Sequence, residues 1–199
     1  MKTRFFHLNY TYKANGSDPW VISFPFAVDE YYDVNSEDFC TSTWNSNFFA
    51  FAYNSPNTQD VDKLDFPAVV GEWHVASARL AAALSNQARG GIEFLPFRTR
   101  TTTGEDITDN YRVIRYLKWV DAVDRKHSKL CADEKSFRRR KEFGGNYDLD
   151  KVVLARHKLV DPVCRIVGWS PYYIFREDVV DSLLVGGFTG LDFKEVDVM

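Results

Sequence analysis

The sequence has 199 residues, of which 45% are hydrophobic and 16% aromatic, and its formal net charge at pH 7 is only −3. This composition excludes a disordered chain, and no apolar run approaches the roughly 18 residues that a membrane-spanning helix needs. A chain of this length can bury a core without disulfides, as one domain or as two small ones.

The N-terminus and the cysteines indicate a cytoplasmic protein. The first residues, MKTRFFHLNYTYK, lack the apolar stretch and the small-residue cleavage site of a secretory signal. The three cysteines are odd in number and far apart, which fits neither a disulfide framework nor a CxxC zinc site. We interpret Cys40, Cys131 and Cys164 as small buried apolar residues, and we expect no metal and no cofactor.

The first half of the sequence predicts short strands separated by loops. Aromatic and β-branched residues typical of strands gather in four segments: FFHLNYTY (5–12), WVISFPFAV (20–28), FFAFAY (48–53) and FPAVVGEWHVA (66–76). Pro25 confines the second segment to a sheet edge or a bulge. Apart from FFAFAY, residues 29–62 are loop-like, and a helix is predicted from Ala78 to Ala88.

The second half predicts a longer series of strands. RTRTTTGEDITD (98–109) is polar and turn-prone, and we interpret it as a hinge. YRVIRYLKWVDAVD (111–124) fits a helix or a strand, and its β-branched and aromatic residues favour the strand. Three further strands are predicted in succession, in a mainly antiparallel sheet: KVVLARHKL (151–159), VCRIVGW (163–169) and PYYIFRE (171–177).

One pattern occurs twice in the chain. Residues 75–97 align without a gap on residues 174–196, and three aligned pairs are identical: Leu84 and Leu183, Gly91 and Gly190, and Phe94 and Phe193. Each copy predicts a strand, a helix with apolar residues at i and i+4, a glycine turn and a second strand. Left-handed glycines would end the helices: Gly90 and Gly91, or Gly186 and Gly187. The similarity indicates either a duplication or the pattern common to any strand-helix-strand unit.

These elements predict an α+β fold, with mainly antiparallel sheets and a few helices packed on one face. We expect a single domain over residues 1–199, which divides into an N-terminal half (1–97) and a C-terminal half (104–199). The strand-helix-strand unit would then occur once in each half.

The C-terminal half resembles a known family. The segments YLKWVDAVDRKHSK (116–129) and KLVDPVCRIVGWSPYYIFREDVVDSLLVGGFTGLDFKEV (158–196) are similar to motifs of immunity-protein family eleven of bacterial polymorphic toxin systems, formerly a domain of unknown function. The matching positions are Asp121, Asp124 and Ser128 in the first motif, and Gly187, Gly190 and Phe193 in the second. The resemblance covers about residues 104–198. One position departs from it, because Arg176 stands where the family has a serine that caps the last helix.

The resemblance implies an immunity protein that binds a cognate toxin and neutralises it by direct contact, with no catalysis. It implies structural roles for the six matching residues. The alternative is a small hydrolase or transferase that uses Asp121, Asp124, His127 and Ser128 as acid-base machinery. We favour the structural reading, because Asp and Ser at strand ends commonly bond backbone amides and fix turns. A scaffold without a toxin partner is a third reading, and the sequence does not specify self-association.

Charge is distributed unevenly along the chain. From Ala14 to Asp62 there are eight carboxylates and no lysine or arginine, a local charge of −8. Between Arg125 and Lys141, eight basic residues and two acidic ones give +6. This basic run lacks the interleaved aromatic residues of nucleic-acid-binding segments, so we interpret it as a solvated surface and expect no nucleic-acid partner.

The acidic segment is the predicted partner-binding site. An acidic, aromatic-rich surface can steer towards a toxin that is basic because it acts on an anionic substrate. The candidate residues are Asp29, Glu30, Tyr31, Tyr32, Asp33, Glu37 and Asp38, with Trp44 as a possible hydrophobic anchor.

Overall fold

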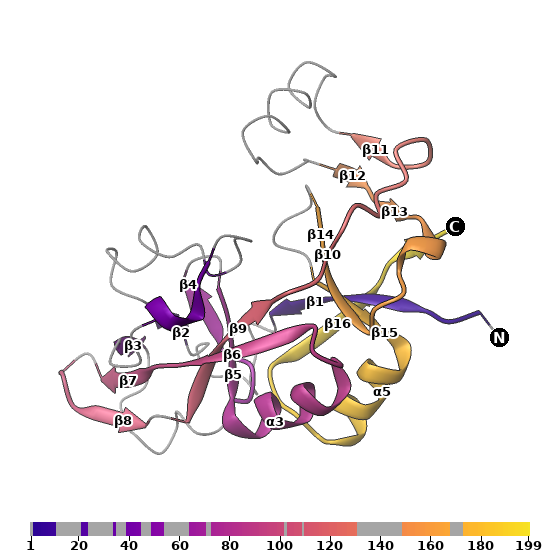
Figure 1. Ribbon diagram of the computed structural model, residues 1–199. Coiled ribbons are helices and arrows are strands. Elements are labelled where there is room, and N and C mark those ends of the chain that lie inside the picture. The colour runs from indigo at the N-terminus through magenta and orange to yellow at the C-terminus, as the bar shows by residue number, and fades with distance from the viewer. Residues whose placement is uncertain are drawn as a thin grey trace.

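The fold is α+β, as predicted, with two α-helices in the described part of the chain and mostly antiparallel sheets (Figure 1). The computed structural model describes residues 2–10, 21–23, 34, 39–44, 49–53, 64–70, 73–101, 103–108, 110–130, 149–167 and 173–199. The helices are α3 (Ala78–Gln87) and α5 (Glu177–Val185). Over these ranges, no helix is long and apolar enough to cross a membrane.

Two sheets carry the repeated units. A three-stranded sheet has the order β5 (His74–Ser77), β9 (Tyr111–Tyr116) and β6 (Ile92–Pro96). A five-stranded sheet has the order β10 (Trp119–Val120), β14 (Val163–Ile166), β15 (Tyr173–Arg176), β1 (Phe5–Tyr10) and β16 (Leu191–Glu195). β9 is antiparallel to both of its neighbours, and so is β1.

The remaining described strands form a second five-stranded sheet and two strand pairs. One sheet has the order β4 (Ala68–Val70), β2 (Val21–Ser23), β3 (Phe49–Tyr53), β7 (Arg98–Thr101) and β8 (Asp106–Thr108). The two separate strand pairs are β11 (Lys129–Leu130) with β12 (Leu149–Lys151), and β13 (Val153–Leu154) with β17 (Asp197–Val198). Short 3-10 helices occupy Thr41–Thr43 and Arg156–Lys158.

Both sequence copies fold as the predicted strand-helix-strand unit, β5-α3-β6 and β15-α5-β16. Each unit leaves a place between its two strands, and a strand from the other half of the chain fills it. β9 lies between β5 and β6, and β1 lies between β15 and β16. Sheet membership therefore crosses the boundary between residues 97 and 104 that the sequence indicated.

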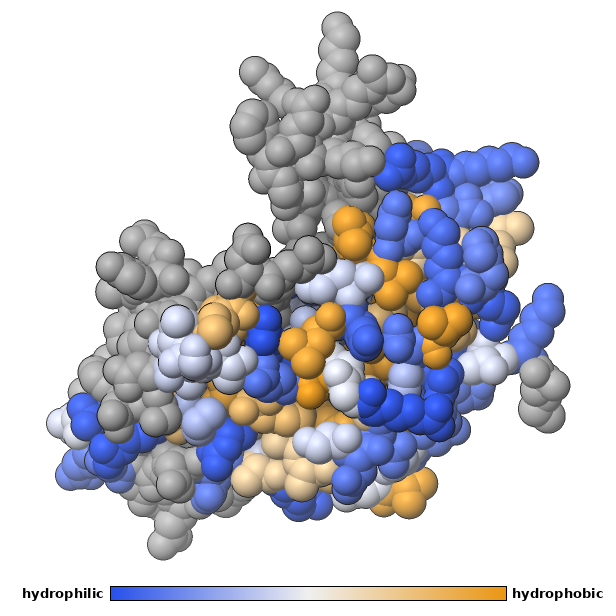
Figure 2. All heavy atoms as spheres, in the orientation of Figure 1, coloured by the Kyte–Doolittle hydropathy of each residue, from blue (hydrophilic) through white to orange (hydrophobic). Residues whose placement is uncertain are grey.

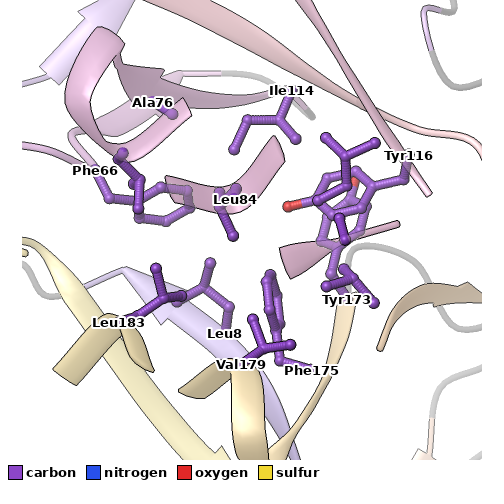
Figure 3. Close-up of a cluster of buried hydrophobic side chains, with 14 of the residues drawn as sticks. Leu8, Phe66, Ala76, Leu84, Ile114, Tyr116, Tyr173, Phe175, Val179 and Leu183 are labelled. Atoms are coloured by element: carbon purple, nitrogen blue, oxygen red, sulfur yellow. The ribbon is translucent and has the colours of Figure 1, made fainter. Parts of the chain in front are cut away.

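In the described part of the chain, three clusters of buried residues form the core. The shared cluster lies between the two units and includes Leu80 and Leu84 of α3, Val179 and Leu183 of α5, and Leu8 of β1. Figure 3 shows these elements converging, with Leu84, Leu183 and Leu8 directed towards a common centre. A second cluster lies behind β5, β6 and β9, and a third lies behind β1, β14 and β15. Each unit is thus buried on both faces.

Hydrophobic residues on the surface are scattered. Figure 2 shows them in small separate groups among hydrophilic residues on one face. Among the residues that the structure describes, the exposed large hydrophobic side chains are Leu117, Val160, Val167, Leu184, Val185 and Met199.

The stretch 98–109, predicted to be a polar, turn-prone hinge, contains an antiparallel hairpin of β7 and β8. Thr99 is buried, whereas Arg98 and Arg100 lie outside and pair with Asp106 at 2.5 and 2.6 Å. The alternation is therefore that of a strand whose inner residue happens to be polar. Gly104, with φ +91°, makes the reversal.

Several other boundaries differ from the prediction. FPAVVGEWHVA contains two strands, β4 and β5, which belong to different sheets. KVVLARHKL contributes β13, which pairs with β17 and not with β14, and its end is a 3-10 helix. Of the four glycines predicted to be left-handed, Gly90 and Gly187 have a positive φ, whereas Gly91 does not and Gly186 has a φ of −68°.

Candidate partner-binding site

The predicted acidic site is described only in part. Asp29, Glu30, Tyr31, Tyr32, Asp33, Glu37 and Asp38 lie outside the described residues. Val34 and residues 39–44 are described, and they show how this segment is attached to the body of the protein.

Arg115 of β9 holds the segment at two points. Its Nε donates to the carbonyl oxygen of Val34 at 2.9 Å, and its Nη2 donates to the carbonyl oxygen of Phe39 at 2.9 Å. The guanidinium lies 4.9 Å from the centre of the Phe39 ring, a cation–π arrangement. The side chain of Arg115 is only 13% exposed, so these bonds are largely shielded from water.

Glu93 of β6 completes the attachment. Its carboxylate pairs with Nη1 of Arg115 at 2.9 Å and accepts hydrogen bonds from Oγ1 of Thr41 at 3.0 and 2.9 Å. Because β6 and β9 are neighbours in one sheet, Glu93 and Arg115 lie directly opposite one another. The rigid sheet therefore determines where Val34 and residues 39–41 sit.

Hydrophobic contacts support the same segment. Val34 is fully buried in the second cluster, and Phe39 and Trp44 pack against that cluster. The indole Nε1 of Trp44 donates to the carbonyl oxygen of Pro96 at 2.7 Å, and its ring lies 5.7 Å from that of Trp73. Trp44, predicted as an anchor for a partner, thus makes its described contacts within the protein.

Cys40 lies in this segment and is exposed, so its interpretation as a buried residue is wrong. Its Sγ lies 2.9 Å from Oγ of Ser42, and this hydrogen bond is the main reason why the pKa of the thiol is lowered. Cys164 is buried as predicted, and burial raises its pKa to about 12. Cys131 lies outside the described residues.

The residues of the mid-chain motif hold a turn. Oδ1 of Asp124 accepts hydrogen bonds from the backbone amides of Lys126 and His127, and its Oδ2 lies 2.9 Å from Nδ1 of His127. The hydrogen bond from His127 is the largest cause of the lowered pKa of Asp124. Oγ of Ser128 donates to the carbonyl oxygen of Val153 and accepts from its amide, at 3.1 and 3.0 Å.

These contacts bear on the alternative interpretation, in which the residues of this motif act as acid-base machinery. Asp124 and His127 form a pair, but the hydroxyl of Ser128 is bonded to the backbone of β13 rather than to His127. Asp121 is exposed, and its carbonyl oxygen accepts from Nζ of Lys158 at 2.6 Å. The structure therefore brings Asp124 next to His127 without aligning Ser128 as a nucleophile. Within the described ranges, no group of three His, Cys, Asp or Glu residues could hold a metal ion.

A second polar centre, which the sequence did not indicate, surrounds Asp65. Its carboxylate accepts hydrogen bonds from Nη2 of Arg79 at 2.6 Å, from Oγ of Ser77 at 2.7 Å and from the amide of Thr189 at 3.0 Å. Burial opposes the charge of Asp65, yet these bonds outweigh it and lower the pKa. Asp65 thereby joins the start of α3 to the glycine turn after α5.

The two glycines of that turn, Gly187 and Gly190, are required for different reasons. Gly187 has φ +61°, and Gly190 has φ +84°. A Cβ on Gly190 would lie 2.2 Å from the carbonyl oxygen of Phe66, so no side chain fits there. Phe193 of β16 packs against the shared cluster, 5.6 Å from the ring of Phe175.

A third centre is the buried His74. Its Nδ1 lies 3.1 Å from the hydroxyl of Tyr116, and its ring lies 4.2 Å from that of Tyr173. Burial, followed by the charge of Arg165, lowers the pKa of His74 to about 3, so the ring is neutral at physiological pH. Arg165 is itself buried, with its guanidinium 4.2 Å from the ring of Trp119.

No protein-family model matches the chain, and no curated protein matches it. The resemblance to an immunity-protein family over residues 104–198 therefore stays a prediction.

Proposed function

We propose that this chain is an immunity protein, which binds a cognate bacterial toxin and neutralises it by direct contact without a cofactor. The observation that carries the proposal is the pair of hydrogen bonds from Arg115 to the backbone of Val34 and Phe39. They attach the most acidic part of the chain to a rigid sheet. These bonds fix the two residues that flank Glu37 and Asp38 in the sequence.

The proposed mechanism is electrostatic steering followed by occlusion. A toxin that acts on an anionic substrate has a basic surface around its active site, and the −8 charge over residues 14–62 attracts such a surface. Fixing Val34 and Phe39 lowers the entropy lost when the residues beside them bind. The proposed contact residues are those predicted from sequence, with Trp44 acting as an internal support for the segment.

The test is charge reversal in the acidic segment. The triple variant Asp33→Lys, Glu37→Lys and Asp38→Lys is expected to lower the association rate with the purified toxin by at least about tenfold, and to abolish protection in cells. The toxin is the product of the large gene expected immediately upstream. Binding is measured by stopped-flow fluorescence at two salt concentrations, because a steered association slows as salt rises.

The matched control has the same change in net charge at exposed carboxylates outside the segment: Glu105→Lys, Asp121→Lys and Asp181→Lys. This control is expected to retain most of the association rate. A further variant, Arg115→Lys, keeps the charge of residue 115 but loses the two bonds to Val34 and Phe39, and it is expected to weaken binding without unfolding the protein. Equal rates for the two triple variants would place the interface elsewhere, and failure of the native chain to bind the toxin would refute the proposed function.

A further inference from the structure

We infer that the chain is a fused pair of equivalent repeats that exchange one strand, so that each strand-helix-strand unit is a binding slot for an extended segment of the other repeat. The first repeat comprises residues 5–101 and the second comprises residues 111–198. This inference does not depend on the proposed function.

The register of the inserted strands is the first support. Ser77 lies opposite Tyr111, and its counterpart Arg176 lies opposite Phe5. At the other end of the units the pairs are Pro96 with Arg112 and Glu195 with Phe6. With residues 75–97 matched to residues 174–196, every recorded pair of β1 with its neighbours has a counterpart on β9. A slip of one residue would turn each side chain to the other face, so agreement over both edges is a strong constraint.

The inserted strands also direct their side chains alike. Leu8 of β1 and Ile114 of β9 occupy matching positions, and both lie in the shared cluster. Phe5 and Tyr111, which point to the opposite face, lie in the third and second clusters respectively. Each slot thus takes a strand that is apolar on both faces.

The equivalence extends beyond the units to two further strand pairs and one backbone hydrogen bond in each repeat. β7 continues from β6 and runs parallel to β3, just as β17 continues from β16 and runs parallel to β13. β2 runs parallel to β4, as β10 does to β14. The amide of Ser77 bonds the carbonyl oxygen of Asp65 at 2.8 Å, and that of Arg176 bonds the carbonyl oxygen of Pro162 at 2.9 Å.

Contacts between the repeats are reciprocal. Gly190 of the second repeat lies against the carbonyl oxygen of Phe66 in the first, with an ideal Cβ 2.2 Å away. Its counterpart Gly91 lies against the carbonyl oxygen of Val163 in the second repeat, with an ideal Cβ 3.2 Å away. Phe66 and Val163 follow the matching residues Asp65 and Pro162. Such reciprocity is the property of an interface between two copies related by a twofold axis.

The two helices also meet at this interface. α3 and α5 lie side by side, and both contribute to the shared cluster (Figure 1). Nε2 of Gln87 in α3 donates to Oγ of Ser182 in α5 at 3.1 Å. The interface of the fused pair is therefore formed by the helices, the two glycine turns and the exchanged strands.

The inference is tested by opening the folded protein beside β1. A specific protease site is inserted within residues 14–18 of the full chain, and the folded protein is cleaved there. The peptide that carries β1 is expected to remain bound through gel filtration. A labelled synthetic peptide of residues 2–13 is expected to exchange with it, as measured by fluorescence anisotropy.

The decisive competitor is a peptide of residues 110–117, which carries β9. If the slots are equivalent, it displaces the labelled β1 peptide, with an affinity about tenfold lower, or about 1.4 kcal/mol. The same peptide with Ile114→Asp would place a carboxylate in the shared cluster, so it is expected not to compete. A scrambled version of the β9 peptide is also expected not to compete.

Two results would overturn the inference. If the β9 peptide competes no better than its scrambled version, the slots are not equivalent. If the cleaved β1 peptide leaves and an excess of labelled peptide is not captured, the unit is not a slot at all. The inference is also overturned if the cleaved protein aggregates and an excess of β1 peptide does not prevent the aggregation.

Discussion

The two units begin their helices with different chemistry. In α3, Oγ of Ser77 accepts from the amide of Leu80 at 3.1 Å and caps the helix. In α5 the corresponding Arg176 makes no side-chain cap, and its guanidinium instead holds Asp178 at 2.7 Å. Glu177, at the start of α5, accepts from both the amide and Nε of Arg4.

The two helices therefore occupy equivalent positions in the fold although different residues begin them. A capping serine satisfies an amide directly, whereas α5 has two carboxylates in its first turn that favour the positive end of the helix dipole. Arg4, which precedes β1, binds one of them, so the exchanged strand also marks where α5 begins. Two different solutions therefore produce helices with the same apolar face.

The equivalent glycines give the largest expected difference. Gly190→Ala combines a positive φ with a Cβ only 2.2 Å from a backbone oxygen, and is expected to lower the free energy of unfolding by about 4 kcal/mol. Gly91→Ala, whose Cβ would lie 3.0 Å from the carbonyl oxygen of Ala88, is expected to cost about 1–2 kcal/mol. Urea denaturation measures both.

The control for this pair is Gly187→Ala. Gly187 has φ +61° but open space around an added Cβ, so the substitution reports backbone strain alone, about 1 kcal/mol. Equal losses at Gly190 and Gly187 would show that the contact with Phe66 is not tight.

The first unit contains a buried histidine, His74, which makes the stability of the protein depend on pH in the acid range. His74 is neutral in the folded protein down to a pKa of about 3, whereas the unfolded chain takes up a proton near pH 6.5. Below pH 6.5 the unfolded state binds more protons, so stability falls as pH falls, by about 3 kcal/mol between pH 6.5 and 4. His74→Phe is expected to flatten this slope in denaturation curves recorded across the range.

The matched control is His157→Gln at the exposed His157. This variant is expected to show the same slope of stability against pH as the native protein. Absolute stability at pH 7 is compared separately, because His74→Phe also removes the partner of the Tyr116 hydroxyl. An unchanged slope in His74→Phe would mean that this ring is protonated in the folded state.

The smallest expected effects come from the helix starts. Ser77→Ala removes a cap and a hydrogen bond to the carboxylate of Asp65, and is expected to cost about 1–2 kcal/mol. Arg176→Ser installs the missing cap and loses an exposed pair with Asp178, so a net gain of about 0.5 kcal/mol is expected. Thermal denaturation of both variants measures the difference, and a loss in Arg176→Ser would show that the arginine pair matters more than a cap.

The sequence predicted the repeated unit because its signals are local. Apolar residues at helical spacing and glycines after each helix are visible in any window of the chain, and the structure confirms both units. The strand exchange leaves no such signal. The register of β1 against β15 joins Phe5 to Arg176, and no periodicity within a segment reveals a pairing over that separation.

The polar centres show the same limit. Asp124 and Ser128 stood out because they are close in sequence, and their hydrogen bonds are local or reach one nearby strand. Asp65 stood alone among apolar residues, and its partner Thr189 lies far along the chain. Arg115, which supports the acidic segment, was read only as one residue of a strand. Only packing identifies such residues.

The place of β1 also has a consequence for synthesis on the ribosome. This strand leaves the exit tunnel long before its neighbours β15 and β16, and its slot is complete only when β16 has been made. At translation rates of about 5–20 residues per second, the delay between β1 and β16 is on the order of 10–40 s. The unit of β5, α3, β6 and β9 can close well before that, while the apolar side chains of β1 remain without their slot until β16 has been made.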